Sequence, residues 1–97
     1  MTITGTFATR VVRVDGRRLS PTRSLRVYNH SPTGFNWGYG GSGPAQLALA
    51  LLLHAKVPTR EAISLHQRFK WEVISPLPQD DFAIECDIAA WVAQHHT

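Results

Sequence analysis

The sequence predicts an α+β fold in which a small N-terminal antiparallel sheet packs on helices. Three observations lead to this prediction. β-Forming residues around an Asp-Gly pair come early, an alanine- and leucine-rich segment lies in the middle, and helical periodicity follows it. Because the strands come first and the helices after them, the order favours α+β over alternating βαβ units. The 97 residues, 43% of them hydrophobic, suit a single domain over 1–97.

About three strands are expected in the first third of the chain. Residues 7–14 are rich in β-formers, with arginines where solvent-facing residues would lie. Asp15-Gly16 indicates a two-residue hairpin, because glycine tolerates the positive φ of a type I′ turn, and residues 17–19 would form the return strand. Residues 24–29 alternate apolar and polar side chains, which predicts a third, half-buried strand.

About three helices are expected after the sheet. Residues 45–55 are leucine and alanine on every side, with Ser42 as a candidate N-cap, and such a helix belongs in the middle of a fold. A second helix is expected over 60–74. Residues 80–84 suggest a short extended piece, and the apolar spacing within 85–94 predicts the last helix.

Composition excludes several classes of protein. The one cysteine, Cys86, forms no intramolecular disulfide, and we expect it as an inert, partly buried thiol at the start of the last helix. The N-terminus lacks the pattern of a signal peptide. The longest apolar run, residues 47–53, is far below the roughly 18 residues that span a bilayer. We therefore expect a cytoplasmic protein with no membrane partner.

Positive charge concentrates in the N-terminal third. Residues 1–36 carry six arginines against one aspartate, a net charge of +5, whereas residues 37–97 carry a net charge of −2. Arginine makes planar, two-pronged contacts with carboxylates and phosphates. Candidate contacts to an acidic protein surface or to nucleic acid are therefore Arg10, Arg13, Arg17, Arg18, Arg23 and Arg26. The alternative is a solvated strand face whose arginines prevent aggregation at the sheet edge.

A glycine-rich loop precedes the central helix. Residues 38–43 match G-x-G-x-x-G, a pattern that holds a pyrophosphate at a helix N-terminus in dinucleotide-binding folds. The following parallel strand with its acidic residue is missing, so we favour a tight loop over which Trp37 and Tyr39 pack. Two alternatives stay open: partner contact through Trp37 and Tyr39, or anion binding by Gly40, Gly41, Ser42 and Gly43.

Residue spacing predicts no metal, cofactor or catalytic site. The five histidines, His30, His54, His66, His95 and His96, lack the spacing of metal ligands. No nucleophile motif is present in the sequence. We therefore expect a non-enzymatic protein without catalytic residues, bound metal or cofactor.

Several segments resemble the signature of a domain-of-unknown-function family. They are the motif WGYGGSGPAQLALA at residues 37–50 with the residues before it from 29, the segment 69–74, the Pro-Leu-Pro at 76–78, and a last helix containing Trp91. The family consists of small proteins from bacteria, phages and mobile elements, and the resemblance implies no activity. It implies a genomic setting in which small proteins bind and block a host complex. Inhibitors of nucleic-acid-guided defence, the anti-CRISPR proteins, are one such class.

These observations predict a small non-enzymatic binding protein. It would dock on its partner through the arginine-bearing sheet or through the Trp37/Tyr39 loop, because arginine and aromatic residues are the usual interface hot spots. A nucleic-acid-binding module that uses the same arginines is one alternative. A small-ligand or anion-binding domain that uses the glycine loop is the other.

Overall fold

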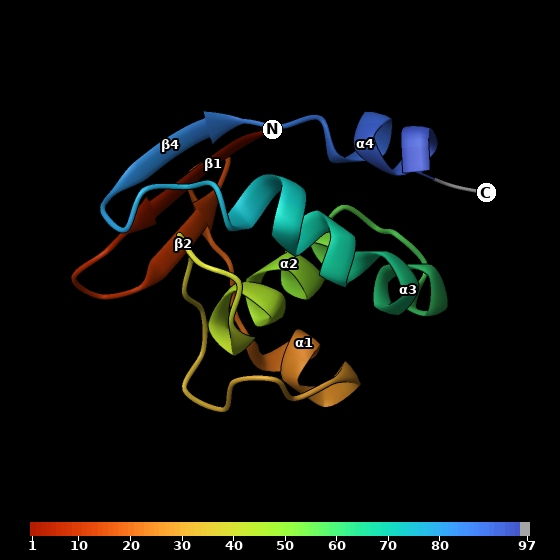
Figure 1. The fold of residues 1–97 in the computed structure, drawn as a ribbon, viewed down its shortest axis with the longest axis horizontal. Coiled ribbons are helices and arrows are strands. Elements are labelled where there is room, and N and C mark those ends of the chain that lie inside the picture. Colours follow the sequence, from red (N-terminus) through yellow and green to blue (C-terminus); the bar gives the residue numbers. More distant parts are fainter. Residues whose placement is uncertain (96–97) are drawn as a thin grey trace.

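The computed structural model describes residues 1–95 as an antiparallel sheet with helices packed against one face (Figure 1). The elements are β1 (Thr2–Thr6), β2 (Val11–Val14), β3 (Arg17–Arg18), α1 (Thr22–Val27), α2 (Ser42–His54), α3 (Thr59–Phe69), the π-helix η1 (Lys70–Ile74), β4 (Phe82–Glu85) and α4 (Ile88–His95). The predicted α+β class is confirmed. The Asp-Gly hairpin is confirmed too, with φ of 50° at Asp15 and 83° at Gly16.

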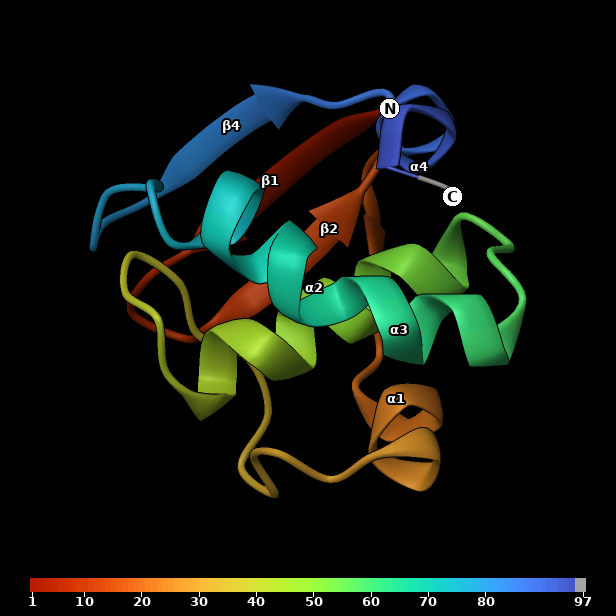
Figure 2. The ribbon, with the colours of Figure 1, turned by 45° about the vertical axis from the view of Figure 1, so that its right-hand side comes forward.

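The sheet has four strands where about three were expected, and β1 (Thr2–Thr6) lies before the first strand that the sequence predicts. Its strand order is β3-β2-β1-β4, so β4 returns after the helices and pairs with β1 (Figure 2). Gly5 of β1 stands opposite Phe82 of β4. A side chain at Gly5 would overlap the rings of Phe82 and Trp37, which explains the glycine inside this strand.

Two of the predicted strands need correction. Residues 24–29 are not a strand: most of them belong to α1 and the turn after it. The hydroxyl of Ser24, which is buried, donates to the Pro21 carbonyl at 2.9 Å, a local bond that favours the helix start. The strand expected over 7–14 is shorter, because residues 7–10 form a turn closed by the Arg10 N–H on the Thr6 carbonyl at 2.8 Å.

The central helix α2 is buried as predicted, from Gly43 to Leu53. Its leucines share one core with Ile3, Val12 and Val14 of the sheet, while α1, α3 and η1 pack around it. Gly41 is the N-cap and Ser42 is already helical, so Ser42 is not the cap that the sequence predicts. None of the helices within residues 1–95 is long and apolar enough to cross a membrane.

The helix expected over 60–74 is observed as α3 followed by η1. A π-helical turn widens its end, with the Ser75 N–H donating to the Lys70 carbonyl at 2.8 Å. The extended piece expected near residue 80 is β4. The last helix starts at Ile88, so Cys86 lies in the connection before α4 rather than inside a helix.

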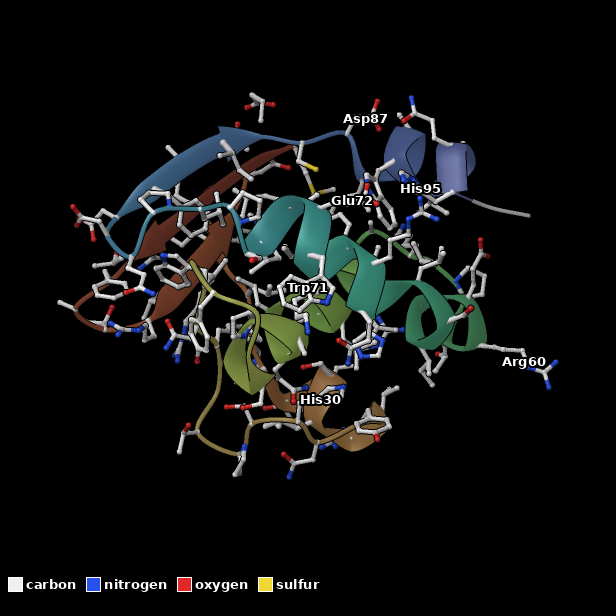
Figure 3. All side chains as sticks on the ribbon, viewed as in Figure 1. His30, Arg60, Trp71, Glu72, Asp87 and His95 are labelled. Atoms are coloured by element: carbon white, nitrogen blue, oxygen red, sulfur yellow. The ribbon has the colours of Figure 1, made fainter. Side chains whose placement is uncertain are left out.

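Glu72 of η1 holds α4 in place (Figure 3). Its carboxylate accepts hydrogen bonds from Arg68 Nε at 2.8 Å and Trp91 Nε1 at 3.3 Å, and His95 Nε2 lies 3.0 Å away. The hydrogen bond from Arg68 is the main reason that the pKa of Glu72 is lowered. The Trp91 ring packs edge-on against Phe69, and the contact joins the last helix to the core.

Candidate binding surface

Five of the six candidate arginines are exposed on three successive elements. We call this set the arginine surface: Arg13 of β2, Arg17 and Arg18 of β3, and Arg23 and Arg26 of α1. Arg13 stands directly opposite Arg18, on the sheet face turned away from buried Val12 and Val14, whereas Arg17 is paired with Val14 and starts from the other face of the edge strand. Like charges opposite each other repel, and in the described part of the chain none of the five forms an ion pair.

Arg10 has a different role from the other five. Its guanidinium lies 3.6 Å above the centre of the Phe7 ring and donates to the Phe7 carbonyl, while Nε donates to Asn36 Oδ1 at 3.1 Å. These contacts tie the turn between β1 and β2 to the loop before α2. Arg10 is therefore a half-buried structural residue, in contrast to the exposed arginines around it.

A cavity of about 200 Å³ opens between β3, α1 and α2, and we call it the basic pocket. Its floor is apolar, made by the buried side chains Leu19, Ala50 and Leu53. Its rim is basic, made by the exposed side chains Arg18, Arg23 and His54; Ser20 and Ser24 complete the lining. No lining residue is acidic, so the pocket combines apolar surface with uncompensated positive charge.

The hydrogen-bond donors around the basic pocket differ in how many bonds they already make within the protein. Arg23 makes one long hydrogen bond, 3.4 Å from a guanidinium nitrogen to the Leu53 carbonyl. The Ser24 hydroxyl is occupied by Pro21 and Gln46. Arg18 and His54 make no side-chain hydrogen bond or ion pair within residues 1–95, so their N–H groups are available to a bound group.

Trp37 and Tyr39, the two aromatic residues predicted as partner contacts, lie in different environments. Trp37 is fully buried between the rings of Phe7 and Phe82, and its Nε1 donates to the Asp80 carbonyl at 2.9 Å. The expectation that Trp37 contacts a partner is therefore wrong, because the core needs this side chain. Tyr39 is 41% exposed and stays a candidate contact.

Close packing explains the glycine loop. A side chain at Gly40 would overlap Trp71, one at Gly41 would overlap Tyr39, and one at Gly43 would overlap Asn36. Gly38 has a φ of +83°, which favours glycine. Neither the basic pocket nor a second cavity of about 90 Å³ beside Arg10 and Arg18 is lined by residues 38–43. Anion binding by Gly40, Gly41, Ser42 and Gly43 stays a prediction.

Sequence reasoning missed Trp71, which is 59% exposed and lies over the loop at Gly40 (Figure 3). Beneath it, the buried Lys70 ammonium donates to the Gly40 carbonyl at 3.2 Å and sits 4.5 Å from the centre of the Trp71 ring. The sequence places Trp71 between the charged residues Lys70 and Glu72, in a helix whose core positions are taken by Phe69 and Ile74. This pattern could have indicated that Trp71 is exposed.

Sequence reasoning also missed a histidine pair. His30 and His66 lie 2.8 Å apart at their Nε2 atoms, and Tyr28 stacks on the His30 ring. His66 Nδ1 lies 2.6 Å from the Ile63 carbonyl, so this nitrogen carries a hydrogen and His66 Nε2 accepts from His30. Within residues 1–95, no three His, Cys, Asp or Glu side chains gather as they would around a metal, and His96 lies outside the described residues.

A family model matches residues 3–94. No curated protein matches the chain, and no solved structure does. The matched residues include the arginine surface, the glycine loop and nearly all of α4. The chain therefore belongs to the Family of unknown function (DUF6166).

Proposed function

We propose that this chain is a non-enzymatic binding protein whose arginine surface docks on an acidic face of a partner protein. The observation that carries the proposal is the set of five exposed arginines without an ion pair in the described residues. Arg13 and Arg18, opposite each other, weaken the strand pair that holds them. Carboxylates of a partner would relieve this repulsion and would be bound through two-pronged contacts.

The apolar floor of the basic pocket favours a protein partner over nucleic acid. Leu19, Ala50 and Leu53 offer a place for an apolar side chain, which a phosphate backbone does not carry. Interfaces between proteins typically combine such an anchor with arginine contacts around it. Binding to phosphates is the alternative that the experiment below separates.

In its finer form, the proposal is that the partner belongs to a host complex and that docking blocks it. A nucleic-acid-guided defence system is one such complex. The support for this form is the resemblance of residues 37–50 to small proteins of bacteria, phages and mobile elements.

The test is affinity capture from a bacterial lysate with three forms of the tagged protein. They are the unchanged protein, a variant with Arg13→Ala and Arg26→Ala, which both lie outside the basic pocket, and a control with Lys56→Ala and Arg60→Ala. Arg60 is exposed on α3 and points into solvent, so the control removes positive charge elsewhere (Figure 3). One half of each lysate is treated with nuclease.

We expect a defined protein to be captured by the unchanged protein and by the control, with or without nuclease, and lost with the arginine variant. Moderate salt should weaken the complex, because exposed charges are screened. Equal capture by all three forms would contradict the proposal. Capture that disappears with nuclease would identify nucleic acid as the ligand instead.

A further inference from the structure

We propose that the basic pocket binds the C-terminal residue of a partner chain, with its carboxylate on the arginines and an apolar side chain on the floor. The inference deepens the proposed function and rests on it, because it names the part of the partner that the arginine surface anchors. The relevant juxtaposition is Arg18 and Arg23 above the buried side chains Leu19, Ala50 and Leu53.

The size of the pocket limits what it holds. At about 200 Å³ it is smaller than the roughly 300–1,000 Å³ of sites that enclose drug-sized ligands, so it accommodates a single residue. That one residue has to satisfy both the apolar floor and the basic rim. A C-terminal leucine or phenylalanine does so, because its side chain and its carboxylate leave the same Cα atom. An internal aspartate or glutamate carries its charge at the tip of the only side chain it could insert.

The arginines, rather than the neighbouring helix, supply the attraction for the carboxylate. The pocket lies beside the C-terminal end of α2, where the helix dipole favours cations. That dipole amounts to about half an elementary charge, whereas Arg18 and Arg23 each bring a full positive charge. Arg18 has its guanidinium donors free in the described residues, and Arg23 uses one in its 3.4 Å bond to Leu53.

His54 completes the rim on the third side. It is the last residue of α2, exposed, and within residues 1–95 its ring makes no hydrogen bond. One ring N–H can donate to the second carboxylate oxygen while the arginines hold the first. The serines contribute less, because the Ser24 hydroxyl is bonded to Pro21 and Gln46, and Ser20 is bonded to Thr22.

The test is a titration of the ¹⁵N-labelled full chain with short acetylated peptides, followed by amide chemical shifts. The first probe ends in leucine with a free carboxylate. The second is the same peptide as a C-terminal amide, the third ends in serine with a free carboxylate, and the fourth carries an internal glutamate before a leucine amide. A fifth probe, 4-methylpentanoate, presents the same side chain and charge as a free small acid.

We expect saturable shifts for the first probe, centred on Leu19, Ser20, Ser24 and His54. Affinity should fall at least about tenfold for the amide, for the serine-ended peptide and for the internal glutamate, because each loses a charged hydrogen bond or the apolar contact. Arg18→Gln and Arg23→Gln should each weaken the first probe at least about tenfold, whereas Arg60→Gln should leave its affinity unchanged. Unshifted amides elsewhere will show that these exposed substitutions leave the fold intact.

Equal binding of the acid and the amide would overturn the inference. Shifts away from the pocket, or no binding by the first probe at millimolar concentration, would overturn it too. Binding of 4-methylpentanoate as tight as that of the peptide would assign the pocket to small apolar acids instead of chain ends. Failure here is distinguishable from failure of the proposed function, because partner capture that depends on Arg13 and Arg26 would persist without peptide binding.

Discussion

The Oε1 atom of Gln46 accepts the backbone N–H of His30 at 2.7 Å. The same oxygen accepts the N–H of Ser31, and Nε2 donates to the Ser24 hydroxyl and to the Tyr28 carbonyl at 3.0 Å each. Gln46 is fully buried in α2, and its amide thus fastens α1 and the segment after it to the central helix.

Replacing Gln46 by leucine should destabilise the protein by about 2–4 kcal/mol, because two backbone N–H groups, the Tyr28 carbonyl and the buried Ser24 hydroxyl lose a partner at once. Urea unfolding followed by circular dichroism measures this loss. The matched control is Gln94→Leu, at an exposed position of α4, which should change stability by less than about 0.5 kcal/mol. A Gln46→Leu protein as stable as the original would show that these bonds add nothing to the fold.

The histidine pair should make the protein less stable in mild acid. Burial, then the charges of His66 and Lys70, lowers the pKa of His30 below its ordinary 6.5. Burial also lowers the pKa of His66, against the effect of its bonds to the backbone of Ile63 and Ala62. Below pH 6.5 the unfolded chain therefore binds protons that the folded chain resists, so stability is full above this value and falls beneath it.

The measurement is the free energy of unfolding in urea at about pH 7.5 and about pH 5.5. The original protein should lose stability between the two, and His66→Gln should show a smaller loss because it removes one of the two titrating rings. His54→Gln, at an exposed position, is the control and should keep the original pH dependence. An unaltered slope in His66→Gln would rule out the pair as the cause.

Gly5→Ala should destabilise the sheet by about 1–3 kcal/mol, the usual cost of overpacking a core. The added methyl group would overlap the rings of Phe82 and Trp37, both of them buried. Thr4→Ala changes the neighbouring residue of β1 without crowding the core and serves as the control. Thermal unfolding should separate the two variants, and equal melting temperatures would refute the proposed crowding.

The Cys86 thiol should react slowly with iodoacetamide in the native protein. Burial is the main cause that raises its pKa above the ordinary 9.0, and the thiolate is the species that reacts. We expect the alkylation rate at about pH 8 to be several-fold lower in buffer than in urea, measured by mass spectrometry. Equal rates in buffer and urea would mean that the fold does not protect this side chain.

Local patterns in the sequence were sufficient to predict most helices and the hairpin. The apolar composition of 45–55 fixed the buried place of α2, and the glycine after Asp15 indicated the hairpin turn. The alternation within residues 24–29 was misleading, because Ser24 finds its partners in Pro21 and Gln46 rather than in a neighbouring strand. Hydrogen bonds between residues far apart in the chain produce no periodic pattern of residue types, so they cannot be predicted from such patterns.

The sequence predicted which residue type, arginine, contributes to the basic pocket. It did not predict which residues the fold brings together there. Clustering of arginine in the first third pointed to Arg18 and Arg23, which the structure places at one pocket. The third member of the rim, His54, comes from the far end of α2, and the apolar floor comes from residues that look like ordinary core. Only folding brings these three elements together, so no spacing rule could have joined them.

The pairing of β1 with β4 has a consequence for how the chain is made. Thr2 stands opposite Glu85, so β1 waits for a strand whose residue is synthesised 83 positions later. Until residue 85 has left the ribosome, β1 has an open edge whose N–H and C=O groups can pair with other chains. Closing a loop of this length also slows folding. The strand order therefore leaves this edge of β1 unpaired until β4 has been synthesised.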